Sequence, residues 1–367
     1  MKCVCTQENL SRGLLVVGHV ASKNTTLPIL SNILVRGDAA GILLSATNLE
    51  IGITKRIRGK VEREGVCAVP GRVFTEYVSL LEEGTVTMEE GGGDLVLRSE
   101  KGETKLHGLP AEDFPLIPHI PKENGYICGA KELREGISQV IFAAAYDDAR
   151  PEISGVLLRF SEKNLVLVAT DSYRLAEKHL KLDQGIHGSD ASVIVPVRAL
   201  QELLRILGQE GESVSVYLAE NQILFVTNET ELISRLIDGQ YPNYEQILPV
   251  NHETRAVMTT DELVKAVRAT SLFSRPGIND LTLSFTPPKT ISLQAANNQI
   301  GENRQTVDAD IDGAENTIVF NSRYLLDGLA NLHREKAVFE MVNNANPGVF
   351  RPQGDDDYLY IIMPIKQ

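Results

Sequence analysis

Acidic side chains that stand close together are the first residues of this chain that could carry out chemistry. Asp147 and Asp148 are adjacent, Asp171 lies in the segment ATDSYRLA, and Asp355–Asp357 form a run of three. Carboxylates of this kind hold Mg²⁺ in enzymes of phosphoryl transfer. The chain has no GxxxxGK[ST], no GxGxxG after a strand and no GxSxG, and both acidic runs lie in predicted turns. We therefore expect no catalytic site, while the enzyme alternative stays open for Asp171.

Cysteine and histidine spacing gives no metal site. The four cysteines are Cys3, Cys5, Cys67 and Cys128, without a CxxC pair and without histidines at ligand spacing. We expect them to be small buried side chains in a reducing compartment. No cofactor and no metal are predicted.

Length and composition describe a globular protein of more than one domain. At 367 residues the chain exceeds a single comfortable core, which favours two or three domains. No apolar run approaches the roughly 18 residues of a membrane span, and the N-terminus MKCVCTQENLSRG lacks the apolar core of a signal peptide. We expect a cytoplasmic protein with no membrane partner. The net charge of −13 argues, by itself, against nucleic-acid binding.

One helical phrase occurs three times, about 125 residues apart. Its copies are VPGRVFTEYVSLL, VPVRALQELLRIL and FNSRYLLDGLANL, with arginines at Arg72, Arg198 and Arg323. An earlier helical phrase begins each repeat, and a proline closes it; these landmarks are Leu10, Leu133 and Leu263, then Pro115, Pro242 and Pro364. Three landmarks in one register indicate three repeats.

The segments between the helices alternate apolar and polar residues and are separated by turn residues, such as the glycines at 91–93. Each repeat is therefore predicted to be an α+β unit in which two helices cover one face of an antiparallel sheet. The predicted domains are 1–124, 125–251 and 252–367.

Repeats stacked head to tail form a solenoid or an arc, and an arc with complementary ends closes into a ring that leaves no bare sheet edge. The candidate edges are 100–108 in the first repeat and 292–305 in the third. The predicted interface residues are Lys101, Thr104, Leu106, Leu272 and Phe273. The alternative for the last two is an ordinary place in the core.

Positive charge gathers in the helical phrases. The six phrases, at 9–23, 70–82, 132–145, 195–208, 262–275 and 321–336, hold twelve basic and eight acidic residues, whereas the rest of the chain totals −17. This pattern favours loose, sequence-blind contact with a nucleic-acid backbone. Ordinary solvated helix faces, or an acidic peptide-binding scaffold without DNA, are the alternatives.

Six longer phrases carry a resemblance to a known family. They are TLPILSNILV (26–35), LPAEDFPLIP (109–118), ATDSYRLA (169–176), SVIVPVRAL (192–200), DGQYPNYEQILP (238–249) and YIIMPIKQ (360–367). With the three repeats, they make the chain similar to the bacterial DNA polymerase III beta subunits, the sliding clamps. The resemblance implies a head-to-tail homodimer that closes a ring of six domains around double-stranded DNA, with the helices inside. It also implies a non-catalytic subunit of a DNA-directed DNA polymerase, which is a nucleotidyltransferase.

The resemblance further implies two sets of site residues. The DNA-contacting positions are Lys23, Asn24, Arg72, Arg150 and Arg198. A groove for short apolar peptides of the polymerase III alpha subunit, other polymerases, the clamp loader and repair proteins is formed by Ile153, Thr170, Tyr173, Arg174, Leu175, Pro242, Ile247, Pro347, Ile361, Ile362, Met363, Pro364 and Ile365. The alternatives are that Ile361 and Ile362 belong to the core and that Arg174 pairs with Asp171.

Overall fold

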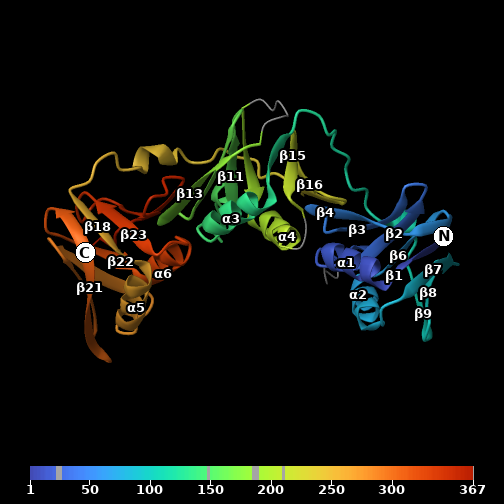
Figure 1. Cartoon of the computed structure of the whole chain (residues 1–367), viewed down its shortest axis with the longest axis horizontal. Helices are drawn as coiled ribbons and strands as arrows, with labels where there is room; N and C mark the ends of the chain where they lie inside the picture. Colours follow the sequence, from blue (N-terminus) through green and yellow to red (C-terminus); the bar gives the residue numbers. More distant parts are fainter. Residues whose placement is uncertain (22–26, 147–148, 184–189, 209–210, 367) are drawn as a thin grey trace. The chain divides into compact units, whose positions relative to one another are not determined.

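The computed structural model describes residues 1–21, 27–146, 149–183, 190–208 and 211–366. The chain forms two compact units. Unit 1 comprises Met1–Lys131, Asp183–His187 and Gln201–Leu236, and unit 2 comprises Glu132–Leu182, Gly188–Leu200 and Ile237–Gln367. The second sequence repeat is therefore divided between the two units, and each unit is described by itself (Figure 1).

Each repeat has the predicted order of strand, helix, four or more strands, helix and three strands. The first repeat consists of β1 (Lys2–Thr6), α1 (Gln7–Val17), β2 (Asn32–Asp38), β3 (Gly41–Thr47), β4 (Ile51–Ile57), β5 (Lys60–Arg63), β6 (Gly65–Pro70), α2 (Gly71–Leu80), β7 (Thr85–Gly91), β8 (Asp94–Ser99) and β9 (Gly102–Leu106). The second consists of β10 (Tyr126–Gly129), α3 (Ala130–Ile141), β11 (Gly155–Phe160), β12 (Asn164–Thr170), β13 (Arg174–Lys181), β14 (Ala191–Pro196), α4 (Val197–Leu207), β15 (Ser213–Ala219), β16 (Gln222–Thr227) and β17 (Thr230–Arg235).

The third repeat has the same order of elements. It consists of β18 (Thr254–Thr259), α5 (Thr260–Ser271), β19 (Asp280–Thr286), β20 (Thr290–Asn297), β21 (Gly301–Gly313), β22 (Asn316–Asn321), α6 (Ser322–Ala330), β23 (Lys336–Met341), β24 (Gly348–Pro352) and β25 (Tyr358–Ile362). Short 3₁₀ turns lie in the connections at η1 (Pro28–Ser31), η2 (Ala111–Asp113), η3 (Pro151–Ile153) and η4 (Tyr244–Ile247).

Local chemistry sets the ends of these elements. The Thr6 hydroxyl caps α1 by accepting a hydrogen bond from the Asn9 amide at 3.2 Å. Asn321 caps α6 in the same way, accepting from the Arg323 amide at 2.9 Å. The tight β7–β8 turn needs left-handed backbone at Gly92 and Gly93, whose φ angles are 65° and 89°.

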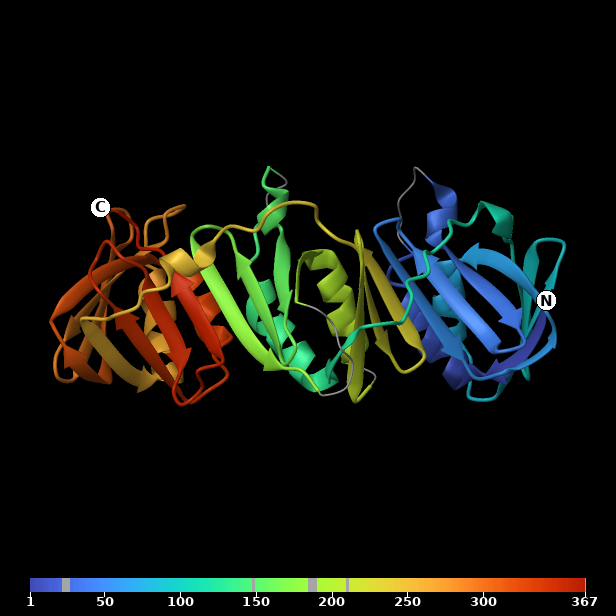
Figure 2. The same ribbon diagram turned by 90° about the horizontal axis from the view of Figure 1, so that it is seen from above.

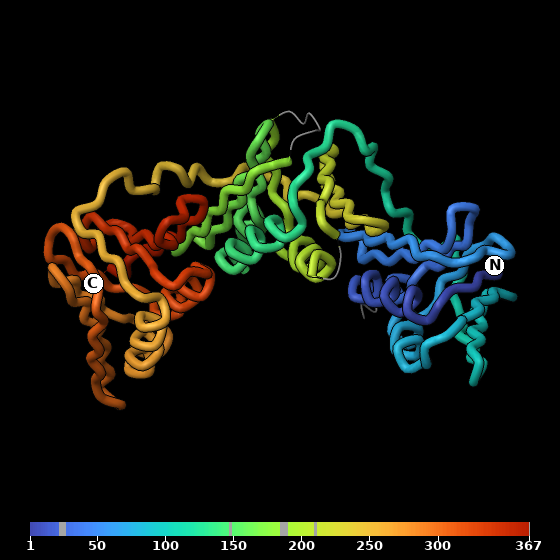
Figure 3. Tube along the Cα trace, in the orientation of Figure 1, coloured from blue at the N-terminus to red at the C-terminus, as the bar shows by residue number. Residues whose placement is uncertain are grey.

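Adjacent repeats share sheets. Unit 1 contains a five-stranded sheet, β5-β1-β7-β8-β9, and an eight-stranded sheet, β10-β15-β16-β17-β4-β3-β2-β6. Unit 2 contains a twelve-stranded sheet, β14-β11-β12-β13-β25-β24-β23-β18-β21-β20-β19-β22. Repeats one and two are therefore joined by β4 and β17, and repeats two and three by β13 and β25. Figure 3 shows that the β20–β21 hairpin extends beyond the other strands of the third repeat.

The helices of the first and third repeats cover one face of their strands (Figure 2). In the third repeat, the helices enclose a core of stacked rings in which Phe285 and Phe339 have centroids 4.8 Å apart. Gly328 of α6 packs directly against the ring of Tyr360. A Cβ at this position would come within 2.0 Å of the ring. Close contact between this helix and β25 therefore requires glycine.

The surplus of positive charge on the helices is smaller than the sequence phrases indicated. Within the helix bounds of the structure there are nine basic and eight acidic residues. Arg275, Arg334 and Lys336 lie outside the helices, Lys23 lies outside the described residues, and Lys131 is added by α3. All four cysteines are buried. Among the described residues, no helix is both long enough and apolar enough to span a membrane.

Candidate peptide groove and nucleic-acid interface

The β12–β13 turn presents an aromatic side chain to solvent. The Thr170 hydroxyl donates to the Arg174 carbonyl at 2.6 Å, and the Asp171 carboxylate accepts from the amides of Tyr173 and Arg174 at 2.9 and 3.0 Å. Ser172 adopts a φ of 78°, which completes the tight turn. The side chains of Thr170 and Asp171 therefore form hydrogen bonds with the backbone of the turn. The side chain of Tyr173, at the tip of the turn, is 61% exposed.

Arg174 is buried and connects the β12–β13 turn to its surroundings through several hydrogen bonds. Its guanidinium donates to Asp171 at 3.0 Å, to the Phe142 carbonyl at 2.9 Å and to Asp327 of α6. It also lies 4.6 Å above the ring of Tyr324. The alternative in which Arg174 pairs with Asp171 is therefore what the structure contains, and the same side chain ties β13 to the third repeat.

The C-terminal strand runs beside β13. Leu175 lies opposite Ile361, and Arg174 lies opposite Ile362. Past the end of β25, the Met363 amide donates to the Tyr173 carbonyl at 2.8 Å. The backbone thus holds the segment Met363, Pro364 and Ile365 next to the Tyr173 turn, with all three side chains half-buried.

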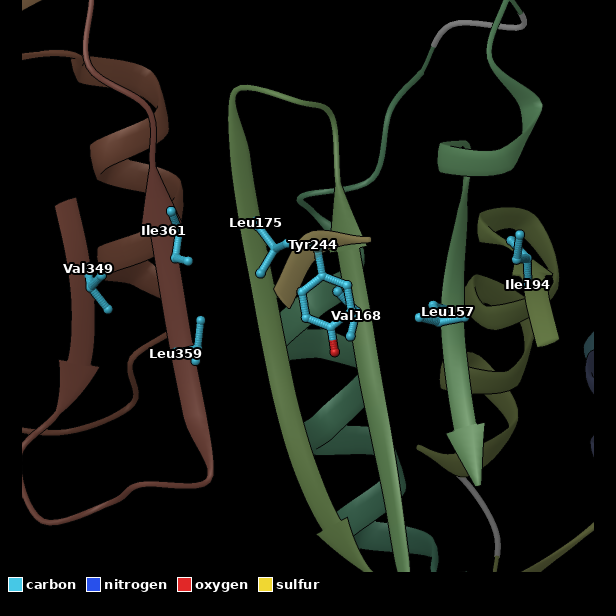
Figure 4. Close-up of a cluster of buried hydrophobic side chains, with 8 residues drawn as sticks. All are labelled: Leu157, Val168, Leu175, Ile194, Tyr244, Val349, Leu359 and Ile361. Atoms are coloured by element: carbon cyan, nitrogen blue, oxygen red, sulfur yellow. The ribbon is translucent and has the colours of Figure 1, made fainter. Parts of the chain in front are cut away.

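Several of the expected groove residues form a floor rather than a surface. Leu175 and Ile361 are 1% exposed and belong to one apolar cluster with Val168 and Tyr244 (Figure 4). Ile153, Ile362, Thr170 and Arg174 are buried as well. Ile361 and Ile362 are therefore buried as core residues, as the alternative interpretation predicted. The expected groove residues that are accessible are Tyr173, Pro242, Ile247 and, in part, Pro347 and Met363–Ile365.

Sequence reasoning missed Tyr324. This residue follows Arg323 in α6, and its ring stacks on Tyr173 with centroids 6.4 Å apart and planes 23° apart. The only sequence signal was an aromatic residue at a helix position where the other two copies have Val73 and Ala199. The structure brings an aromatic pair and the apolar tail together in unit 2, and η4, which ends at Ile247, packs Tyr244 against the strands beneath them.

A polar network adjoins the apolar cluster through Tyr244. Arg159 pairs with Glu245 at 2.7 Å and donates to the Tyr244 hydroxyl, while His179 contacts Glu177 at 2.9 Å. Burial would raise the pKa of the Glu177 carboxyl, but its hydrogen bonds to His179 and Tyr244 outweigh burial and lower that pKa. These residues line a cavity of about 610 Å³.

The repeated arginines occupy one structural position. Arg72, Arg198 and Arg323 are each the second residue of a helix that follows a six-residue strand. All three are exposed; Arg72 pairs with Glu76 at 2.7 Å, whereas Arg198 and Arg323 have no ion pair within the described part of the chain. A cation at this end of a helix is unfavourable without a partner. An external anion would therefore be attracted to it.

The remaining candidates for DNA contact, Arg150, Lys23 and Asn24, do not share the helix position of the three arginines. Arg150 donates to the Ser172 hydroxyl at 2.8 Å, so it lies at the β12–β13 turn. Lys23 and Asn24 lie outside the described residues. Their contact with DNA remains a prediction.

The interface candidates lie at β9 in unit 1 and just after the end of α5 in unit 2. β9 is the outer strand of its sheet and carries Thr104 and the buried Leu106, while Lys101 precedes it and pairs with Glu82 at 2.6 Å. In unit 2, Leu272 is 72% exposed. Phe273 lies near the start of β21, since a Cβ on Gly301 would be 4.0 Å from its ring.

Comparison with known proteins accounts for all three repeats. Models of the N-terminal, central and C-terminal domains of the DNA polymerase III beta subunit match residues 1–118, 128–243 and 245–366. The chain belongs to this family. It is 30% identical over 355 residues to the beta sliding clamp of Staphylococcus aureus strain N315, covering 94% of each chain, and 30% identical over 388 residues to that of Synechocystis, covering 100% of this chain and 99% of the relative.

Solved structures agree. The DNA polymerase sliding clamp of Bacillus subtilis has a TM-score of 0.94 at 28% identity and covers 100% of this chain and 99% of its own. The Pseudomonas aeruginosa sliding clamp bound to griselimycin has a TM-score of 0.95 at 28% identity, with full coverage of both chains. As a member of the family, the chain is a sliding clamp, a non-catalytic processivity subunit of a DNA polymerase, and has three clamp domains.

Proposed function

We propose that two copies of this chain close head to tail around double-stranded DNA and tether the replication machinery through the groove built on Tyr173. The partners would be the polymerase III alpha subunit, other polymerases, the clamp loader and repair proteins. Because these act on bacterial chromosomal DNA, the protein would work in the cytoplasm. Domain boundaries near residues 124 and 251 belong to the same proposal.

The observation that carries ring closure is a pair of strand edges that have no partner strand among the described residues. Within one chain, β4 of the first repeat pairs with β17 of the second, and β13 of the second pairs with β25 of the third. The corresponding strands are β9, an outer strand of its sheet, and the first part of β21. β21 pairs with β20 along residues 301–308 but with β18 only along residues 309–313, so one edge of residues 301–308 has no partner among the described strands. Bare edges of this kind favour pairing with another strand, and a closed dimer would satisfy both.

Weak electrostatics supports encirclement over gripping. The protein carries a net charge of −13, and the helices have only one more basic than acidic residue. Affinity for DNA by direct contact grows with the number of phosphates neutralised, so such a surface would hold DNA poorly in physiological salt. A ring needs no tight contact, and exposed arginines such as Arg198 and Arg323 would serve a loose, sliding one.

The groove has the properties of a peptide site. Tyr173 and Tyr324 offer a stacked aromatic wall, and Met363, Pro364 and Ile365 offer an apolar strip held by backbone hydrogen bonds. A thioether among apolar side chains adapts to peptides of different shape. The buried Leu175–Ile361 floor would keep this surface in place.

A topological test decides between the clamp and its alternatives. We would load the protein onto a nicked circular plasmid with a clamp loader and ATP, wash with high salt, and then linearise the plasmid. The proposal expects retention on the circle and release after cutting. Loss of protein from circular and linear DNA alike in high salt would mean direct electrostatic binding, and an acidic scaffold would not load at all.

A further inference from the structure

We propose that the first repeat carries a second peptide groove, built on the β3–β4 turn, which takes an apolar side chain flanked by one acidic and one basic residue. All the residues of this groove belong to unit 1. It goes beyond the proposed function, which needs only the groove built on Tyr173, and it would let one chain hold a second class of partner segment.

The turn between β3 and β4 has the same hydrogen bonds as the β12–β13 turn that presents Tyr173. The Thr47 hydroxyl donates to the Ile51 carbonyl at 2.9 Å, and its oxygen accepts from the Leu49 amide at 3.1 Å. The side-chain oxygen of Asn48 accepts from the amides of Glu50 and Ile51 at 3.0 and 2.8 Å. Leu49 has a φ of 76°, where the equivalent residue of the other turn has 78°. Each of these bonds has its counterpart in the β12–β13 turn.

The hairpin of the third repeat closes with a different turn. Counting along the strands from the paired core residues Ile42 and Ile291, Ala296 stands at the position of Thr47. Alanine has no hydroxyl, so the third repeat cannot form the threonine-based turn. Among the three hairpins, this turn therefore accompanies the two whose second strand pairs with a strand of the next repeat, β4 with β17 and β13 with β25.

An apolar floor lies beneath the β3–β4 turn, as it does in the Tyr173 groove. Gly52 lies opposite Ile233, just as Leu175 lies opposite Ile361. A Cβ on Gly52 would come within 3.0 Å of both Ile117 and Ile233, so Ile117, from the segment after η2, packs directly on β4. Ile233 is buried and belongs to an apolar cluster against which Ile117 also packs. The floor is thus fixed by tertiary contacts.

Two exposed leucines stand beside this floor. Leu49, at the tip of the turn, is 46% exposed, and Leu116 is 95% exposed. Both line a hollow of about 110 Å³, together with Pro115, Pro118 and Ile233. The hollow is smaller than sites that take whole small molecules, and it suits a single apolar side chain. Leucines exposed singly need no explanation, but apolar side chains that gather around a hollow with a polar rim mark a binding groove.

The rim of this hollow is charged where the rim of the other groove is aromatic and apolar. The Arg235 amide donates to the Glu50 carbonyl at 3.0 Å, as the Met363 amide does to the Tyr173 carbonyl, so Glu50 and Arg235 take the places of these two residues. Both charged side chains are exposed, and neither forms an ion pair in the part of the chain that the structure describes. A partner with one basic and one acidic residue beside its apolar anchor would satisfy both charges. The two grooves therefore select different peptides.

Photo-cross-linking locates the peptide on the full-length protein. The probes are two peptides, GSDLKSG and GSKLDSG, in which photo-leucine, the diazirine analogue, replaces the leucine. We expect the bound peptide to label residues 47–52, 115–118 and 233–235, identified by mass spectrometry after digestion. Labels confined to the Tyr173 groove, or spread evenly over the surface, would overturn the inference.

Charge exchange tests the rim. Glu50→Arg combined with Arg235→Glu exchanges the two charges and keeps the net charge. We expect wild type to prefer one of the two peptide orders by about tenfold in fluorescence anisotropy titrations, and the exchanged variant to prefer the other order by about as much. Glu162→Arg combined with Lys163→Glu, at exposed residues of the β11–β12 turn, is the matched control and should keep the wild-type preference. Equal affinity for both orders, or an unchanged preference in the exchanged variant, would refute the charged rim.

Leu116→Ser separates the two grooves. Because this side chain is 95% exposed, we expect unchanged thermal stability and unchanged binding of the purified alpha subunit, with about a tenfold loss of affinity for the preferred peptide. Tyr173→Ala should do the reverse, losing alpha-subunit binding and keeping the peptide.

Two other results would overturn the second groove. Loss of alpha-subunit binding in Leu116→Ser would mean that the two hollows serve one site, and self-association that Leu116→Ser abolishes would assign the hollow to another copy of the chain. Failure of the alpha subunit to bind wild type would instead contradict the proposed function, and labelling of residues 47–52 by the peptide would still support the second groove.

Discussion

The guanidinium of Arg174 on β13 donates a hydrogen bond to the carboxylate of Asp327 on α6, which lies 153 residues further along the chain. The arginine is 8% exposed and the aspartate is 49% exposed. One charge is therefore buried and depends on partners from the next repeat. The contact links the turn that presents Tyr173 to the helix that presents Tyr324.

Arg174→Ala should destabilise unit 2. The change leaves Asp171 without its buried partner and removes the donor to the Phe142 carbonyl, so we expect a loss of about 3 kcal/mol in the free energy of unfolding. Urea denaturation followed by circular dichroism measures it. Arg159→Ala, which removes a more exposed pair with Glu245, is the control and should cost less than about 1 kcal/mol. Equal losses of stability for the two variants would contradict the inference that the buried contacts of Arg174 stabilise unit 2.

Tyr173→Ala should weaken partner binding without weakening the fold. Tyr173 is exposed and its ring stacks on the Tyr324 ring, so we expect about a 30-fold loss of affinity for the purified polymerase III alpha subunit and little change in thermal stability. Surface plasmon resonance measures the affinity. Tyr146→Ala is the control, because Tyr146 is also exposed and belongs to none of the groove residues. Unchanged affinity of Tyr173→Ala would place the partner site elsewhere.

Local patterns were enough to predict the repeats but not the groove. The helices α2, α4 and α6 begin within two residues of the predicted phrases, because caps and apolar periodicity are encoded locally. The stacking of Tyr173 on Tyr324 depends instead on the pairing of β13 with β25, whose residues are far apart in the chain. No periodicity within either segment specifies that pairing.

The count of basic residues in the helices also depended on contacts that the sequence does not show. The phrase 262–275 counted Arg275 as part of a positive helix, yet α5 ends at Ser271 and Arg275 pairs with Asp280 at 2.7 Å in the following loop. Where a helix ends, and which carboxylate reaches back to it, depends on tertiary contacts. The sequence therefore overestimated the positive surplus of the helices.

Arg198→Ala combined with Arg323→Ala should reduce the salt dependence of DNA binding without opening the ring. Each lost phosphate contact lowers the slope of log affinity against log salt by about 0.9. We expect a shallower slope in fluorescence anisotropy titrations of short duplex DNA, and unchanged retention on circular plasmid after loading. Arg255→Ala is the control, because Arg255 lies on β18 and pairs with Glu340. An unaltered slope in the double variant would exclude these arginines from DNA contact.

The buried thiols should be unreactive in the folded protein. Burial raises the pKa of Cys5 and of Cys67 to about 12, so their thiolate fraction near neutral pH is very small. We expect all four cysteines to react with DTNB within seconds in denaturant and over hours at most under native conditions. Rapid native reaction of any thiol would show that the sheets open locally around it.

Stability should fall slightly as pH rises through the titration of His179. The hydrogen bond to Glu177 raises the pKa of this imidazole above its usual 6.5; burial opposes the shift, while Asp357 adds to it and Arg159 opposes it. The folded state therefore favours the protonated imidazole. Its contribution is complete below pH 6.5 and is lost as pH rises through the raised pKa. Glu177 remains ionised throughout this window because its own pKa is lowered.

His179→Gln should remove that part of the pH dependence. Because the imidazole is 47% exposed, we expect a difference of only about 1–2 °C between wild type and variant in how far the unfolding midpoint falls from pH 6 to pH 9. Differential scanning calorimetry at constant ionic strength measures it, with His119→Gln, at an exposed histidine, as the control. The same decline in His179→Gln as in wild type would mean that the Glu177–His179 pair contributes nothing, whereas a steeper decline would reverse the sign assigned to it.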